Sequence, residues 1–151
     1  MRQLTRRAAL AIGASGAALS IVGFSRGALA AAKEAAEQIA KFTAGKTVEQ
    51  GKVTIELPEI AENGNTVPLS IAVDSPMTAD NFVSEIIVVS EGNPNPGVAT
   101  FHLTPMSGKA QVATRIRLAA TQNIVVVAKT SSGQFLTGQK LVKVTIGGCG
   151  G

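Results

Sequence analysis

The sequence contains no tryptophan or tyrosine, and it has one histidine and one cysteine among its 151 residues. Without Trp or Tyr the chain lacks the aromatic side chains on which nucleic-acid bases commonly stack. A single His and a single Cys exclude a four-ligand Cys/His zinc site built from this chain alone. One cysteine also excludes a disulfide within the chain, so the thiol of Cys149 is free, joined to another molecule or covalently loaded.

Recognisable catalytic motifs are also missing. No G-x-S-x-G nucleophile elbow occurs, and no glycine-rich phosphate loop precedes a predicted helix. His102 falls on the polar face of a predicted strand, which favours a solvated or interface histidine. Asp74 and Asp80 flank a predicted loop, where they could position a partner or a cation, although turn chemistry explains them equally well. The residues therefore predict neither an enzyme nor a bound metal or cofactor.

The N-terminal segment has the three parts of an export signal. A charged region contains Arg6 and Arg7, and an apolar stretch rich in small side chains follows it. Ala28-Leu29-Ala30 then supplies an A-x-A cleavage site. We therefore expect residues 1–30 to be removed as a signal peptide.

The pair Arg6-Arg7 resembles a twin-arginine signal, the kind that exports folded proteins across the bacterial inner membrane. Ala9 stands where such signals usually place a bulky residue, so an ordinary secretory signal with the same destination is the alternative. An uncleaved membrane anchor fits less well, because glycines interrupt the segment and a cleavage site follows it. We expect a periplasmic protein with no membrane attachment once the signal is removed.

The net positive charge of the chain comes from the arginines of this expected signal. The whole chain has 14 Lys and Arg against 10 Asp and Glu, and four of the arginines lie within residues 1–30. Removing those four leaves ten basic residues against ten acidic ones. Because nucleic-acid binding depends on an excess of Lys and Arg, this balance argues against a nucleic-acid partner.

Residues 31–50 are expected to form an N-terminal helix and a linker. Apolar side chains recur at helical spacing in 31–45, and Gly45 is suited to end the helix; the apolar positions are Ala32, Ala35, Ala36, Ile39 and Phe42. This apolar stripe is narrow, so the helix should lie against the domain or against a partner and would not persist alone.

Residues 51–146 alternate apolar and polar side chains with a period of two, separated by Gly, Pro and Asn turn signals. Asn63-Gly64 predicts a hairpin turn, and Pro68 predicts an edge position or a bulge. The pattern predicts an all-β fold, an immunoglobulin-like antiparallel β-sandwich of about seven strands, although the Cys…Trp…Cys signature of true immunoglobulin domains is absent. The expected strands are 52–57, 66–73, 83–90, 97–103, 110–118, 122–129 and 135–146.

The chain ends in Gly147-Gly148-Cys149-Gly150-Gly151. Glycines on both sides remove neighbouring side chains and allow almost any backbone angle. Residues 147–151 are therefore expected to form a flexible arm, able to extend roughly 17 Å, with a thiol near its tip. Prenylation needs C-a-a-X and a dithiol catalyst needs C-x-x-C, and neither motif is present. The alternative is a frayed C-terminus that has no function.

The ending VTIGGCGG resembles the C-terminus of the SoxY family, the sulfur-carrying subunits of bacterial periplasmic thiosulfate oxidation. The similarity extends over most of the chain after the signal, in the segments 60–77, 93–105 and 113–119, which read IAENGNTVPLSIAVDSPM, NPNP…VATFHLTP and ATRIRLA. The resemblance implies that Cys149 is the covalent attachment point of the pathway intermediates. It implies a carrier protein on which partner enzymes act.

The resemblance also implies specific partners. A SoxZ-like chain forms a heterodimer with the carrier, a haem cytochrome loads thiosulfate as a cysteine S-thiosulfonate, and a hydrolase releases sulfate. A sulfane dehydrogenase oxidises the remaining sulfur in pathways that have one. The rival hypothesis is an exported structural or adhesin-like β-sandwich whose Cys149 forms an intermolecular disulfide.

Overall fold

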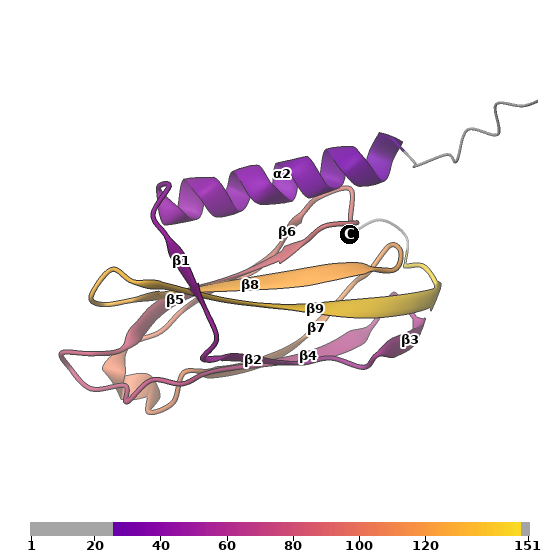
Figure 1. Cartoon of the computed structure of the whole chain (residues 1–151). Helices are drawn as coiled ribbons and strands as arrows, with labels where there is room; N and C mark the ends of the chain where they lie inside the picture. Colours follow the sequence, from indigo (N-terminus) through magenta and orange to yellow (C-terminus); the bar gives the residue numbers. More distant parts are fainter. Residues whose placement is uncertain (1–25, 149–151) are drawn as a thin grey trace, which may run out of the picture.

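The computed structural model describes residues 26–148 (Figure 1). This part of the chain contains one α-helix, nine β-strands and one short 3₁₀ turn. In chain order the elements are α2 (Arg26–Thr43), β1 (Val48–Gln50), β2 (Val53–Glu56), β3 (Ile60–Asn63), β4 (Val67–Val73), β5 (Val83–Ser90), β6 (Gly97–His102), η1 (Pro105–Ser107), β7 (Gln111–Ile116), β8 (Gln122–Thr130) and β9 (Phe135–Ile146).

The strands form two sheets that pack face to face (Figure 1). The larger sheet has the strand order β1-β9-β8-β5-β6, with β3 added alongside β9. The smaller sheet has the order β2-β4-β7. Every pairing within this frame is antiparallel except the two made by β1 and β3, which run parallel to β9. The predicted β-sandwich is confirmed.

The core lies between the two sheets. In β4 the alternating residues Val67, Leu69, Ile71 and Val73 are all buried, as the period of two predicts. They pack in one cluster with inward-facing residues of the larger sheet, among them Ile86, Val88, Ile124, Val126 and Val142. The outward positions of β4 are exposed or half-buried, so this sheet has one apolar face and one face toward solvent.

The helix α2 covers the other face of the larger sheet (Figure 1). Ile39 and Phe42 pack there against Val125, Val127 and Phe135, and the rings of Phe42 and Phe135 meet edge to face with centroids 5.6 Å apart. Of the two predicted alternatives, the domain or a partner, the structure shows the helix packed against its own domain. Its buried stripe differs slightly from the prediction, because Ala36 is exposed and Ala31 is buried.

The helix α2 starts earlier in the chain than the sequence predicts, and it ends next to Gly45, as the sequence predicts. The helix begins at Arg26 and therefore includes Ala28 and Ala30, the expected cleavage positions, whose processing stays a prediction. At the other end, Ala44 and Gly45 adopt positive φ angles of 51° and 72°. The amide of Gly45 donates to the carbonyl of Ala40 at 3.2 Å. This geometry ends the helix as Gly45 predicts.

Two local predictions need correction, and the prediction for Pro68 holds only locally. The Asn63-Gly64 turn does not make a hairpin, because β3 pairs with β9 and the following β4 belongs to the other sheet. Two short strands, β1 and β3, were not expected, and β1 lies in the segment 31–50 that was expected to hold only the helix and a linker. Pro68 lies in the central strand of the smaller sheet, but β2 ends opposite Ser70, so one side of Pro68 is locally an edge.

Among the described residues, no helix is both long enough and apolar enough to cross a membrane.

Candidate functional site

Three backbone hydrogen bonds hold the last described residues to the end of the sandwich. The amide of Gly64 donates to the carbonyl of Ile146 at 2.8 Å, and the amide of Leu118 donates to the carbonyl of Gly64 at 2.8 Å. The amide of Gly148 donates in turn to the carbonyl of Leu118 at 2.9 Å. These bonds close a ring through the C-terminal segment, the turn after β3 and the link between β7 and β8. We call this ring, formed by Gly64, Leu118 and residues 146–148, the anchor.

Glycine is required at three positions of the anchor by close backbone approach. A Cβ atom on Gly64 would overlap the carbonyl oxygen of Leu118 and lie 2.7 Å from the amide nitrogen of Gly148. A Cβ atom on Gly147 would overlap the carbonyl oxygen of Ala119, and one on Gly148 would lie 2.9 Å from the carbonyl oxygen of Gly64. Real Cβ atoms do not approach backbone this closely. The lack of a side chain therefore serves packing at these positions.

This finding corrects the predicted boundaries of the arm. Residues 147–151 were expected to extend freely from the last strand, but Gly148 is buried and hydrogen-bonded and Gly147 lies against Ala119. The anchor thus takes in the first two glycines of the expected arm. Cys149, Gly150 and Gly151 lie outside the described residues, as do Arg6 and Arg7 of the expected export signal.

A buried pair of amide side chains holds the β7–β8 link from behind. The side chain of Asn93 donates to the carbonyl of Arg117 at 2.8 Å and accepts from the amide of Ala119 at 2.9 Å. It also accepts a bond of 2.8 Å from Gln122, which donates to the carbonyl of Ala120 at 3.0 Å. Asn93 and Gln122 are 3% and 5% exposed. Because these buried side chains form hydrogen bonds with one another and with the backbone, they hold the link in place on both sides of Leu118.

The network closes on the turn that carries Asn93. The side-chain oxygen of Gln122 accepts a bond of 2.8 Å from the amide of Gly92. A Cβ atom at Gly92 would lie 2.8 Å from the Cβ of Gln122, so this turn also depends on a missing side chain. The polar residues of the segment 91–96 therefore do more than turn the chain. They position the link that receives the C-terminal glycines.

Segments far apart in the sequence meet at this end of the molecule. The anchor and its support draw one residue or more from each of the stretches 60–77, 93–105, 113–119 and 144–151, which carry the family resemblance. Sequence reasoning treated the first three as strands and turns and the fourth as an independent arm. No sequence signal joins these stretches, because Gly64 is read as a hairpin residue and the burial of Asn93 is known only from the structure.

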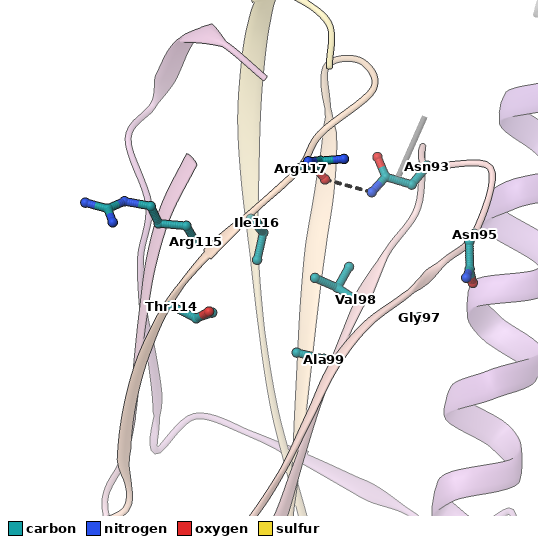
Figure 2. Close-up of a pocket in the computed structure, with 9 residues that line it drawn as sticks. All are labelled: Asn93, Asn95, Gly97, Val98, Ala99, Thr114, Arg115, Ile116 and Arg117. Carbon is teal, nitrogen blue, oxygen red and sulfur yellow. Dashed lines mark hydrogen bonds between the residues drawn. The ribbon is translucent and has the colours of Figure 1, made fainter. Parts of the chain in front are cut away.

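A cavity of about 210 Å³ opens between the edge strands β6 and β7. Figure 2 shows Val98 and Ala99 on one side of it and Ile116 on the other, with Arg115 extending away from them. At one end of the cavity the side chain of Asn93 points to the carbonyl of Arg117, the contact that supports the anchor (Figure 2). The lining combines apolar side chains with a few polar groups from Asn93, Asn95, Thr114 and Arg117.

The other candidate residues lie apart from the anchor and form no catalytic group. The side chain of His102 is 75% exposed, and its Nδ1 lies 3.9 Å from the carboxylate of Glu85, which is compatible with the predicted solvated or interface histidine. Asp74 and Asp80 are both exposed in the loop between β4 and β5. Within residues 26–148, no three His, Cys, Asp or Glu side chains gather in a way that could hold a metal ion.

The fold and the anchor together define a β-sandwich protein in which residues 146–148, the last that the structure describes, are held at one end of the sandwich. The sequence model of the family described as "Sulfur oxidation protein SoxY" matches residues 39–149, a range that includes Cys149. The chain belongs to the SoxY family. SoxY proteins are sulfur carriers in sulfur oxidation, and membership of the family implies a SoxZ partner.

A solved structure supports this assignment. The sulfur carrier protein SoxY from Chlorobium limicola f thiosulfatophilum is 33% identical, with a TM-score of 0.64. The alignment covers 76% of this chain and 99% of that one.

Superoxide reductases share the fold at low sequence identity. The superoxide reductase (neelaredoxin) from Ignicoccus hospitalis is 19% identical, has a TM-score of 0.56 and aligns over 62% of this chain and 80% of its own. The superoxide reductase from Nanoarchaeum equitans is 10% identical, has a TM-score of 0.54 and aligns over 64% and 100%. These likenesses concern the β-sandwich alone. A comparison with curated protein sequences found no match.

Proposed function

We propose that this protein carries sulfur intermediates of thiosulfate oxidation as covalent adducts of Cys149 in the periplasm. The observation that carries the proposal is the match of the SoxY family through residue 149, together with the anchor, which holds Gly148 at the end of the sandwich. Cys149 is the sole thiol of the chain and directly follows Gly148. Family membership favours this carrier role over an exported structural module linked by disulfides.

The proposed loading step is an oxidation. The outer sulfur of thiosulfate forms a disulfide-type bond with the sulfur of Cys149, and the thiol proton passes to solvent. Two electrons leave in this step, and a haem cytochrome accepts them. The product is the cysteine S-thiosulfonate, and this chain supplies the nucleophilic sulfur and its position.

The proposed unloading step is a hydrolysis on a partner enzyme. Water attacks the terminal sulfonate sulfur and the S–S bond to it breaks; sulfate leaves with release of one proton, and a protonated persulfide remains on Cys149. A sulfane dehydrogenase then oxidises the remaining sulfur where the pathway has one. A covalent carrier suits this sequence of steps because the intermediate stays at high effective concentration and does not diffuse away between enzymes.

The export signal supports a periplasmic site for this chemistry. Arg6-Arg7, an apolar stretch and Ala28-Leu29-Ala30 form a twin-arginine-type signal. The near balance of charges after residue 30 is compatible with a carrier that serves several enzymes in turn, because no large field of one sign favours a single class of partner.

Substitution of the thiol tests the proposal. Cys149→Ser, combined with a SoxZ-type chain, the loading cytochrome and thiosulfate, should reduce no cytochrome above background and release no sulfate. The free energy of unfolding should stay within about 0.5 kcal/mol of the parent protein, since the change lies outside the described core. Met106→Ser is a matched control, because Met106 is 96% exposed and lies apart from the anchor. Normal turnover by Cys149→Ser would refute the carrier role.

A further inference from the structure

We propose that the free edge of β6 binds an extended, acidic segment of a partner protein, which pairs with β6 as an added strand of the larger sheet. The surface belongs to the sandwich itself, and it goes beyond the proposed function because it involves neither Cys149 nor the sulfur chemistry. Two grooves flank β6, one on each face of its sheet, and arginines line one of them. The free backbone groups, the two grooves and the charges together point to this kind of partner.

Two residues of β6 direct their backbone groups away from the sheet. The amide of Leu103, just after β6, donates to the carbonyl of Ser84 at 2.9 Å. In an antiparallel pair, residues bonded in this way alternate with residues whose N–H and C=O groups point away from the neighbouring strand. In the register of β6 with β5, Thr100 and His102 therefore have their backbone groups on the free edge. No other described strand pairs with them, since β6 is the last strand of the larger sheet.

β6 is also the edge strand with the least protection against pairing. Five of the described strands pair with one neighbour only, namely β1, β2, β3, β6 and β7. The sequence of β6, GVATFH, contains no Asp, Glu, Lys or Arg. The other four edge strands each carry one charged side chain, in chain order Glu49, Glu56, Glu62 and Arg115. Because charged side chains on an edge strand oppose pairing with another chain, β6 is the edge best suited to accept one.

A β-bulge at Val98 marks where the regular part of this edge begins. Gly97 lies opposite Val89, and Ala99 lies opposite Val88. Val98 is therefore an extra residue on the edge strand. An added strand would pair beyond the bulge, with the residues from Ala99 to the end of β6.

The two grooves lie where the side chains of an added strand would point, because side chains along a strand alternate between the two faces of its sheet. On the core side is the cavity of about 210 Å³ between β6 and β7, whose apolar lining is Val98, Ala99 and Ile116 (Figure 2). On the helix side is a more open groove of about 380 Å³ between β6 and α2, lined by Gln38 and Thr100 among others. Strand addition combines backbone bonds along an edge with pockets for alternate side chains, and this edge offers both.

The charges around the cavity favour an acidic segment. Arg115 and Arg117 line its β7 side, both are exposed, and no residue that lines either groove is acidic. Neither arginine forms an ion pair with another described residue. Arg115 extends away from the apolar lining (Figure 2), which leaves its guanidinium free to meet a carboxylate of a chain lying over the cavity. The segment that fits this edge alternates small apolar residues with Glu or Asp.

Amide hydrogen exchange measured by NMR tests the proposal on the full mature chain, kept reduced. In the protein alone, the amides of Thr100 and His102 should exchange at least about tenfold faster than that of Phe101, which faces β5. The acetylated and amidated peptide TVEVTVE should slow the exchange of Thr100 and His102 by at least about threefold. The peptide TVKVTVK is the matched probe, and it should bind at least about fivefold more weakly because only its charges differ.

Two proline variants distinguish β6 from the neighbouring edge. Thr100→Pro removes an N–H group from the free edge of β6, and it should weaken binding of TVEVTVE at least about fivefold. Ala113→Pro is the matched control, because in the register of β7 with β4 it removes an N–H group from the free edge of β7. It should change the affinity by less than about twofold. Circular dichroism shows whether each variant is folded.

Unchanged exchange of Thr100 and His102 in the parent protein, at the highest soluble concentration of TVEVTVE, would overturn the proposal without need of any variant. Equal affinity for the two peptides would overturn the assignment of an acidic segment. Protection of these amides that rises with protein concentration in the absence of peptide would assign the edge to a second copy of this chain, and it would also overturn the proposal. None of these results depends on the thiol, so the carrier role of Cys149 is tested separately by Cys149→Ser.

Discussion

The amide nitrogen of Gly148 lies 2.9 Å from the carbonyl oxygen of Leu118, and this contact attaches the residue before Cys149 to the end of the β-sandwich. Leu118 is completely buried and its own amide is bonded to Gly64. The terminal thiol therefore follows directly from an ordered part of the fold. A glycine pair that looks like a flexible joint in the sequence is a packing element in the structure.

The two glycine pairs around Cys149 should respond differently to substitution. Gly148→Ala places a Cβ atom 2.9 Å from the carbonyl oxygen of Gly64, and we expect it to lower the free energy of unfolding by about 1–3 kcal/mol. Gly150→Ala should change it by less than about 0.5 kcal/mol. Urea denaturation followed by circular dichroism measures both. Equal stability of the two variants would contradict the packing role of Gly148.

The Asn93 network should be sensitive to the loss of one donor. Asn93→Asp replaces the amide that donates to the carbonyl of Arg117 with an oxygen, so two acceptors face each other at a separation that is 2.8 Å in the parent protein. We expect a loss of about 2–3 kcal/mol in the free energy of unfolding. Asn95→Asp is the control, because Asn95 lies exposed in the same turn and should stay within about 0.5 kcal/mol. A similar small effect for both would show that the network contributes little.

The strands of the sandwich could be predicted because burial of one face imposes a period of two. Val67, Leu69, Ile71 and Val73 follow that rule, and they are buried together. The short strands β1 and β3 could not be predicted, because their sequences VEQ and IAEN do not alternate apolar and polar residues and their pairing with β9 joins distant segments. The Asn63-Gly64 pair was misleading because hairpin turns and close backbone contacts both favour glycine.

The anchor lay beyond sequence reasoning because it consists of backbone groups. Nothing in the letters Gly-Gly distinguishes a free joint from a site where a carbonyl such as that of Ala119 excludes a Cβ atom. Cys149 could be singled out because chemistry attaches to its side chain and no other residue of the chain carries a thiol.

Docking of the N-terminal helix should depend on Phe42. Phe42→Ala removes the edge-to-face contact with Phe135 and apolar surface shared with Val125 and Val127. Because Phe42 is only half-buried, we expect a loss of about 1–3 kcal/mol, below the range for a fully buried aromatic residue. Lys41→Ala, at an exposed neighbouring position, should change the free energy of unfolding by less than about 0.5 kcal/mol. Thermal unfolding at one protein concentration compares the variants, and equal midpoints would refute the packing role.

The partner complex should not depend on the thiol. The apolar face of α2 already covers the larger sheet, while β6 and β7 each pair with one strand among those the structure describes. The unpaired backbone groups at such strand edges can form hydrogen bonds with a second chain. We expect a stable heterodimer with a SoxZ chain that buries on the order of 1,600 Å² or more in total.

Size-exclusion chromatography with light scattering checks this expectation, with and without reductant. Reductant should remove disulfide-linked species formed through Cys149 when the protein is alone, and it should leave the SoxZ complex intact. A protein that stays monomeric with SoxZ under both conditions would contradict the heterodimer.

Mass spectrometry of the C-terminal tryptic peptide, VTIGGCGG after cleavage at Lys143, tests the central claim most directly. The native protein, incubated with thiosulfate and the loading cytochrome and digested without reductant, should yield this peptide with the added mass of a thiosulfonate, and after hydrolysis with that of one sulfur. Reductant should return the peptide to its unmodified mass. A peptide that stays unmodified under loading conditions, or that appears only as a disulfide between two chains, would contradict the carrier function.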